Sequence, residues 1–127
     1  MEIINKSYLK FNEEERDRLR YMTLYDRSFI RDNIDDNPEE IDVFVATQKN
    51  GEIDEFLGWG IVIGWLPKWK LFMVYIHPLY RLKGIGTILA KMAKQKHKNI
   101  GMVRDFTSKK FIDKLCKEIN IYTVEDL

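Results

Sequence analysis

The chain has 127 residues, which is the size of one small domain, and its 45% hydrophobic and 32% charged residues exclude a disordered or low-complexity chain. No apolar run approaches the ~20 residues that a membrane span needs, and no signal-peptide pattern opens the sequence. We therefore expect a single cytoplasmic domain over residues 1–127 that does not enter a membrane. One cysteine and two widely separated histidines disfavour both a disulfide and a metal site.

The net charge of +1 conceals an asymmetry along the chain. Residues 11–55 carry fourteen acidic against six basic side chains, and residues 68–117 carry thirteen basic against two acidic ones. Solvated helix faces account for such patterns in many proteins. The alternative is a bipolar surface whose basic half suits an anionic ligand and whose acidic half suits a cationic one.

The first predicted element is a helix over Glu13–Arg31. Asn12 is its expected N-cap, and Glu15 stands three residues later as the partner of a capping box. Apolar side chains recur behind this start at helical spacing, at Leu19, Met22, Tyr25 and Phe29. Residues 32–40 then form a polar, acidic connection.

Three strands follow as an antiparallel meander, over Asp42–Lys49, Phe56–Trp65 and Trp69–His77. Alternation in the middle strand predicts one face made of Leu57, Trp59, Ile61, Ile63 and Trp65. Its other face would carry Phe56, Gly58, Gly60, Val62 and Gly64.

The rest of the chain alternates between helices and strands. The pattern predicts a helix over Gly86–Lys98, a strand over Ile100–Phe106, a helix over Ser108–Glu118 and a last strand over Ile119–Val124. The first of these helices should bury Ile88, Leu89 and Met92 and expose Lys91, Lys94 and Lys96. The fold class is therefore α/β in the broad sense (α+β), with a mainly antiparallel sheet and flanking helices.

The segment Met73–Leu89 contains the residues that indicate a ligand-binding site. A strand breaks at Pro78 and enters a helix through a tight basic turn that contains Gly84 and Gly86. Unpaired backbone N–H groups at a helix start bind phosphate where no side chain blocks the approach. The turn lacks the Gly-Lys-Ser/Thr of a nucleoside triphosphatase and the third small residue of a dinucleotide fingerprint, since Leu89 stands there. An anion site of another kind is predicted.

The turn Arg81-Leu82-Lys83-Gly84-Ile85-Gly86 resembles the Arg/Gln-x-x-Gly-x-Gly/Ala signature of the GNAT superfamily of acyl-CoA N-acyltransferases. The resemblance implies that acetyl-CoA is the cofactor and that its pantetheine arm lies beside Tyr75 and Ile76. It also implies that a backbone N–H of one of these two residues polarises the thioester carbonyl. The pyrophosphate would bind the N–H groups of Arg81, Leu82, Lys83, Gly84, Ile85, Gly86 and Thr87.

The sequence departs from the family where catalytic groups are expected. Many members carry a tyrosine acid on the last helix, in a stretch like Phe-Tyr-x-Lys-x-Gly-Phe. Alignment by eye places Ile112 at that tyrosine and Cys116 at the glycine, and Lys70 where some relatives have a glutamate base. The remaining candidate catalytic residues are Tyr75, His77 and Tyr80, each of which also has a purely structural interpretation.

Two functions follow from the resemblance. One is an N-acetyltransferase that acts on a primary amine, and the alternative is a degenerate member that binds CoA or a macromolecular partner without turnover. Carboxylates crowd the connection after the first helix and favour a cationic acceptor: Asp32, Asp35, Asp36, Glu39, Glu40 and Asp42. Nucleic acid as a partner and a homodimer stay open alternatives, the former because lysines gather in the second half, at Lys91, Lys94, Lys96, Lys98, Lys109 and Lys110.

Overall fold

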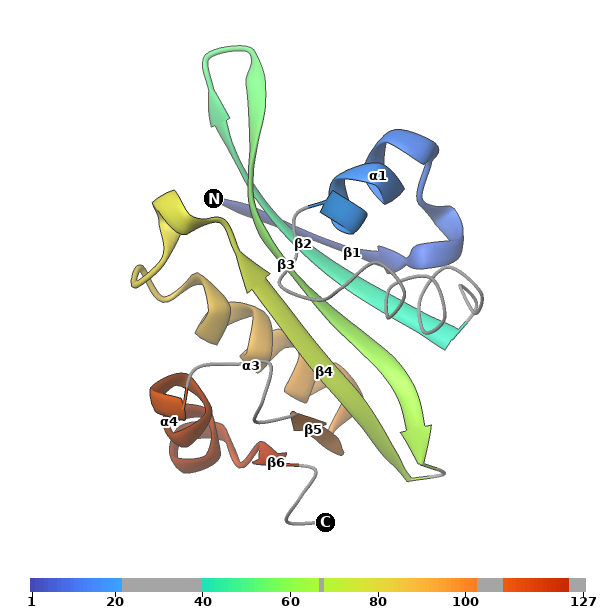
Figure 1. Ribbon diagram of the computed structural model, residues 1–127, viewed down its shortest axis with the longest axis vertical. Helices are drawn as coiled ribbons and strands as arrows, with labels where there is room; N and C mark the ends of the chain where they lie inside the picture. Colours follow the sequence, from blue (N-terminus) through green and yellow to red (C-terminus); the bar gives the residue numbers. More distant parts are fainter. Residues whose placement is uncertain (22–39, 67, 103–108, 124–127) are drawn as a thin grey trace.

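The computed structural model describes residues 1–21, 40–66, 68–102 and 109–123. One six-stranded sheet in the order β1-β2-β3-β4-β5-β6 runs through the molecule (Figure 1). The first four strands are antiparallel neighbours, and β5 and β6 join in parallel. The elements are β1 (Glu2–Ser7), α1 (Glu13–Tyr21), β2 (Ile41–Asn50), β3 (Ile53–Leu66), β4 (Trp69–Ile76), α3 (Ile85–His97), β5 (Ile100–Met102), α4 (Lys109–Ile119) and β6 (Tyr122–Thr123), with short 3-10 helices at Tyr8–Lys10 and Pro78–Tyr80.

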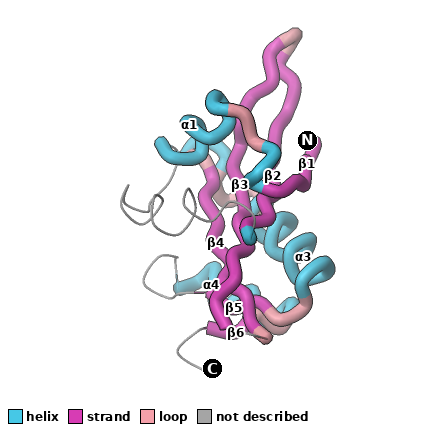
Figure 2. The backbone as a smooth tube through the Cα atoms, turned by 90° about the vertical axis from the view of Figure 1, so that its right-hand side faces the viewer, coloured by secondary structure: helices cyan, strands magenta, loops and turns pink. Residues whose placement is uncertain are grey.

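Helices cover both faces of the sheet, and Figure 2 shows α1 and α3 on opposite sides. The core on one face joins the sheet to α3 and α4 and contains Phe44, Val62, Phe72, Leu89 and Leu115. The core on the other face joins the sheet to α1 and contains Tyr8, Leu19, Val43, Trp59 and Ile61. Neighbouring residues of one strand therefore enter different cores, as the strand period requires.

The predicted element order was wrong at its start because it omitted β1. This strand pairs with β2 from Glu2 opposite Thr47 to Ser7 opposite Asp42. Its sequence does not alternate between apolar and polar residues, since Ile3 and Ile4 are adjacent, and only Ile3 is half-buried while Ile4 is 44% exposed. The strand forms because β2 offers a free edge, which is information that the local sequence does not contain.

A β-bulge reverses two predicted side-chain positions in β3. The β2–β3 register passes from Ala46 opposite Gly58 to Thr47 opposite Phe56, so Leu57 is the extra residue. Leu57 consequently packs with the α3-side core, and Phe56 packs against the α1-side core. The prediction that Leu57 shares a face with Trp59 was therefore wrong. Trp59, Ile61 and Ile63 do share the α1 side, and the side chain of Trp65 lies outside the described part.

The capping box at the start of α1 is confirmed. The Asn12 side chain accepts from the Glu15 N–H (2.8 Å), and the Glu15 carboxylate accepts from the Asn12 N–H (3.1 Å). The described helix runs to Tyr21, and residues 22–39, which hold the rest of the predicted helix and most of the acidic connection, lie outside the described residues. Among the residues that the structure does describe, no helix is long and apolar enough to cross a membrane.

The later elements agree with prediction in kind and differ in detail. Helix α3 begins at Ile85 and buries Leu89, Ala90 and Ala93, whereas Ile88 is 39% exposed, so its predicted burial was wrong. A start at Ile85 sets the buried stripe at four-residue steps through Leu89 and Ala93, and Ile88 falls beside that stripe. The predicted continuation of β5 to Phe106 and the Ser108 cap of the last helix fall on residues 103–108, which are outside the described ranges.

Strands β4 and β5 pair only over a short stretch. Lys70 lies opposite Ile100 and Leu71 opposite Gly101, whereas β4 pairs with β3 along its whole length up to Ile76. The second half of β4 thus has β3 on one edge and no described strand on the other.

Candidate functional site

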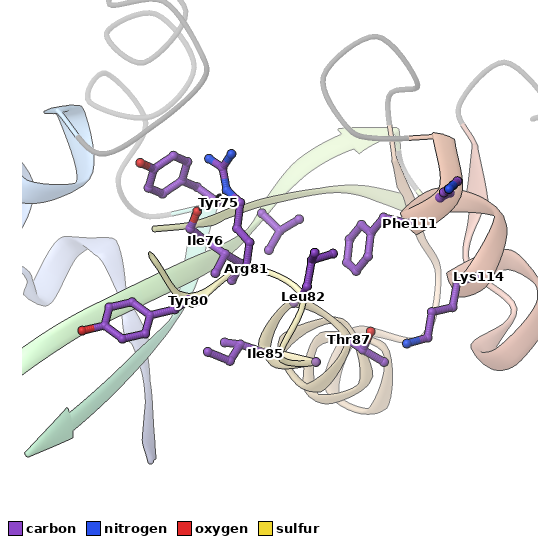
Figure 3. Close-up of a pocket in the computed structure, with 13 residues that line it drawn as sticks. Tyr75, Ile76, Tyr80, Arg81, Leu82, Ile85, Thr87, Phe111 and Lys114 are labelled. Carbon is purple, nitrogen blue, oxygen red and sulfur yellow. Dashed lines mark hydrogen bonds between the residues drawn. The ribbon is translucent and has the colours of Figure 1, made fainter. Parts of the chain in front are cut away.

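A cavity of about 500 Å³ opens at the end of β4, where this edge meets the start of α3 (Figure 3). Four parts of the chain line it: β4, the turn after it, the first turn of α3, and α4. The lining residues are Val74, Tyr75, Ile76, Tyr80, Arg81, Leu82, Gly84, Ile85, Gly86, Thr87, Lys110, Phe111 and Lys114. Most of the residues predicted to bind the cofactor are therefore brought together, and Lys83 is not among those that line the cavity.

Two backbone hydrogen bonds determine which N–H groups of β4 face the cavity. The His77 N–H donates to Leu57 O on β3 (2.8 Å), and the Lys70 N–H donates to Asn99 O on the opposite side (3.0 Å). The N–H and C=O groups of successive residues point alternately to the two edges of a strand. The backbone N–H and C=O groups of the even-numbered residues from Lys70 to Ile76 therefore point away from β3. Arg81 Nε donates to Ile76 O (2.9 Å), which agrees with this assignment. Of the two N–H donors predicted for a carbonyl, the alternation favours that of Ile76 over that of Tyr75.

The two glycines of the turn have different roles in the fold. Gly84 is the N-cap of α3 with a left-handed φ of 81°, and a Cβ placed on it would meet no atom within 4 Å. A Cβ on Gly86 would lie 3.0 Å from the ring of Phe111. Gly84 thus leaves the helix start open on the cavity side, whereas Gly86 makes room for α4.

The charge of the cavity suits a polyanion that carries an apolar arm. Arg81, Lys110 and Lys114 line it, and none of its described lining residues is acidic. Its walls include the apolar side chains of Ile76 and Phe111 (Figure 3). Sequence reasoning missed Phe111 and Lys114 as site residues, although the spacing of Lys110, Phe111 and Lys114 places them on one side of a helix.

Two of the α3 lysines that were considered as nucleic-acid contacts, Lys94 and Lys96, are engaged within the fold. Lys96 contacts Asp42 (2.8 Å) and Asn5 (2.7 Å), and Lys94 donates to the backbone carbonyl of Lys98. Asp42 also accepts from His97 Nε2 (2.7 Å).

Burial raises the pKa of Asp42, but hydrogen bonds from Lys96, His97 and Asn5 outweigh that effect and hold the pKa below its ordinary value. Asp42 is therefore bound within the fold and is not a free member of the predicted cation-recruiting cluster. Of the other members, Glu40 is exposed and the remaining four lie outside the described residues.

Tyr80 fastens the turn to the β2–β3 hairpin, which extends beyond the rest of the sheet in Figure 1. Its hydroxyl donates to Glu55, which also accepts from Asn50 Nδ2 (2.6 Å) and Gln48 Nε2 (3.1 Å). The bond to Glu55 raises the pKa of Tyr80, and the bonds from Tyr80, Asn50 and Gln48 lower the pKa of Glu55. The phenolic proton of Tyr80 is thus held by a carboxylate.

The other two candidate catalytic side chains have defined neighbours. Tyr75 lies beside Trp59, with ring centroids 6.0 Å apart, and beneath the Arg81 guanidinium at 5.7 Å. His77 caps the 3-10 helix at Pro78–Tyr80, since its Nδ1 accepts from the Leu79 N–H (3.2 Å). His77 does not line the cavity, so the structure brings Tyr75 and Tyr80 to it but not His77.

The structure corrects the alignment of the last helix. Helix α4 continues through Cys116 to Ile119, and Asn120 beyond it has a left-handed φ of 56°, which is the conformation of a helix-ending glycine. The glycine of the family pattern therefore corresponds to Asn120, and the tyrosine four residues earlier corresponds to Cys116. Ile112, previously aligned with that tyrosine, is only 1% exposed. With either alignment, a tyrosine hydroxyl is missing from this position.

Comparison with known proteins agrees with this geometry. The model of the "Acetyltransferase (GNAT) family" matches residues 2–110. A solved structure of the NatC complex bound to Gag peptide and CoA superposes with a TM-score of 0.60 at 20% sequence identity, covering 91% of this chain and 80% of that one. Comparison with curated protein sequences gave no match. The open helix start, the three cations and the apolar walls fit coenzyme A, and the chain belongs to the GNAT family of acetyltransferases, with acetyl-CoA as its cofactor.

Proposed function

We propose that this protein is an active N-acetyltransferase that transfers an acetyl group from acetyl-CoA to a primary amine. The observation that carries the proposal is the edge of β4 that faces the cavity and leads directly into the anion-binding turn. A cofactor arm can pair with this edge while its pyrophosphate accepts hydrogen bonds from the start of α3.

The residues of the chain act mainly by positioning and by electrostatics. When bound, acetyl-CoA supplies the thioester whose C–S bond breaks as the amine nitrogen forms the new C–N bond. The Ile76 N–H is aimed to stabilise the charge that develops on the carbonyl oxygen. Arg81 donates to the carbonyl of Ile76, which belongs to the next peptide unit, and so holds the strand end in place beside that N–H. The ammonium form of the acceptor gives up a proton to solvent before its nitrogen attacks, and the amine proton released on forming the amide also goes to solvent. The departing sulfur has a thiol pKa near ~8.5, so it can take its proton from solvent.

For the acceptor we propose a cationic amine of a peptide, a protein or a polyamine. The acidic residues between positions 32 and 40 support a cation because they attract it electrostatically. The peptide in the structurally similar NatC complex supports a peptide or protein as the carrier of that amine.

Thiol release from acetyl-CoA tests the proposal. We expect release only when an amine is present, with a matching gain of one acetyl group in the amine by mass spectrometry. Cationic amines should be preferred over neutral ones, and the preference should weaken at high ionic strength. CoA binding without amine-dependent thiol release would instead support the second candidate, a CoA-binding member without turnover. That candidate is favoured by Cys116 on α4, which stands where many family members carry a tyrosine acid.

Replacing Tyr80 with phenylalanine tests whether Tyr80 acts as an acid or as a fastening for the turn. Because Glu55 holds its proton, we expect kcat of Tyr80→Phe to stay within about threefold of the parent, whereas loss of a committed general acid costs ~100-fold or more. The KM for acetyl-CoA should rise severalfold, and Glu55→Gln added to Tyr80→Phe should have little further effect.

The contribution of the Tyr80–Glu55 bond to thermal stability should depend on pH in a defined way. The pKa of Glu55 is lowered, so the contribution is complete above the ordinary value of 4.5 and is lost as the pH falls through the lowered pKa. The pKa of Tyr80 is raised, so the contribution is complete below 10.0 and is lost as the pH rises through the raised pKa. A melting-temperature difference between parent and Tyr80→Phe that persisted well below the Glu55 pKa would contradict this account.

A further inference from the structure

Leu82 has two features that are unfavourable in a protein without ligand. Its φ of 64° lies in the left-handed region, where a leucine side chain is strained. The side chain is also completely exposed to solvent. Neither feature is compensated by contacts with a core, so the fold alone does not explain a leucine at this position.

The position of Leu82 relates it to the cofactor. Its side chain lines the cavity, and Figure 3 draws it between Arg81 and Phe111. Leu79, three residues earlier in the same turn, is also largely exposed, at 74%, but does not line the cavity. Both leucines of the turn are therefore exposed, but only Leu82 is exposed toward the cavity.

We propose that the Leu82 side chain covers the pantetheine arm of CoA and holds it against the Phe111 wall of the cavity. The N–H groups at the start of α3 take the pyrophosphate, and the first groups beyond it on the pantetheine side are the two methyls of the pantoyl unit. These methyls are the most apolar part of the arm, and a leucine over them removes apolar surface of both partners from water. The strained conformation of Leu82 aims its side chain at this contact.

Calorimetric titration of Leu82→Gly and Leu82→Asn tests the proposal, because both residues accept a left-handed backbone and neither restores the apolar cover. We expect CoA and 4′-phosphopantetheine to bind about tenfold more weakly to both variants. Affinity for 3′,5′-ADP, which lacks the arm, should be unchanged. The melting temperature of the ligand-free variants should equal or exceed that of the parent. Leu79→Asn is the matched control and should keep the parent affinity for all three ligands.

Unchanged affinity for CoA in Leu82→Asn would overturn the proposal, as would an equal loss for 3′,5′-ADP or a clear fall in the stability of both ligand-free variants. The proposal rests on CoA as the cofactor and uses binding as its readout. Normal CoA binding by the parent without amine-dependent thiol release would therefore overturn the proposed acetyl transfer and leave the role of Leu82 standing.

Discussion

Gly84→Glu is expected to abolish CoA binding, with an affinity loss of at least ~100-fold, while the protein stays folded. Gly84 lines the cavity at the start of α3, and a Cβ there meets no protein atom within 4 Å. The new side chain can therefore extend into the space at the helix start without disturbing the core. Its carboxylate would occupy the position where the helix N–H groups otherwise bind a phosphate, and its negative charge would repel the phosphate. Isothermal titration with CoA measures the loss.

Gly51→Glu is the matched control for this experiment. Gly51 also has a left-handed φ, of 69°, and open space around a Cβ, but it lies at the tip of the β2–β3 hairpin away from the cavity. Both variants carry the same new charge and a similar backbone strain of about 1–2 kcal/mol. Only Gly84→Glu should lose CoA. Equal affinity for CoA in the two variants would show that the turn is not part of the CoA-binding site.

Gly58→Ala is expected to lower the free energy of unfolding by about 2–4 kcal/mol. A Cβ on Gly58 would lie 2.5 Å from the carbonyl oxygen of Tyr75 and 2.7 Å from Cδ1 of Ile76. The nearer atom belongs to the backbone of β4, so no rotamer change relieves the contact. The end of β4 would have to move away from β3, and this is the part of the strand that faces the cavity. Urea denaturation measures the stability, and the affinity for CoA should fall with it.

Gly64→Ala, in the same strand, is the control for the effect of a methyl group alone. Its Cβ would find only a carboxylate oxygen of Glu40 at 3.6 Å, an ordinary van der Waals distance. We expect a change within ~0.5 kcal/mol. Equal destabilisation by the two substitutions would mean that the Gly58 contact relaxes at no cost.

Features that depend on neighbours in the sequence could be predicted from it. The capping box joins Asn12 to Glu15, and the glycine turn that we propose binds the pyrophosphate lies within the seven residues from Arg81 to Thr87. Both rest on backbone conformations that particular residue types favour locally. For the same reason, the sequence predicted correctly which later segments are helices and which are strands, and which residues form the turn before α3.

Features that depend on partners distant in the sequence could not be predicted. Tyr80 donates to Glu55 across 25 positions, and β1 exists because β2 pairs with it. The bulge at Leu57 appears only when two strands are aligned, since one strand alone shows an unbroken alternation. The predicted end of the last helix at Glu118 is one residue from the observed end at Ile119, but alignment with the family pattern took Cys116 instead of Asn120 for the glycine and so misplaced the tyrosine position.

The short described pairing between β4 and β5 bears on how the proposed cofactor should affect the stability of the folded protein. Within the described residues the two strands pair only at Lys70 and Leu71, so an arm bound as proposed would extend the sheet along an edge of β4 that no described strand covers. A ligand that binds only the folded state stabilises it by about 2.7 kcal/mol at a concentration one hundred times its Kd. We therefore expect bound acetyl-CoA to suppress local opening at this edge and the proteolysis that follows such opening. If the cofactor binds at this edge as proposed, a greater supply of acetyl-CoA is expected to lengthen the lifetime of the folded protein.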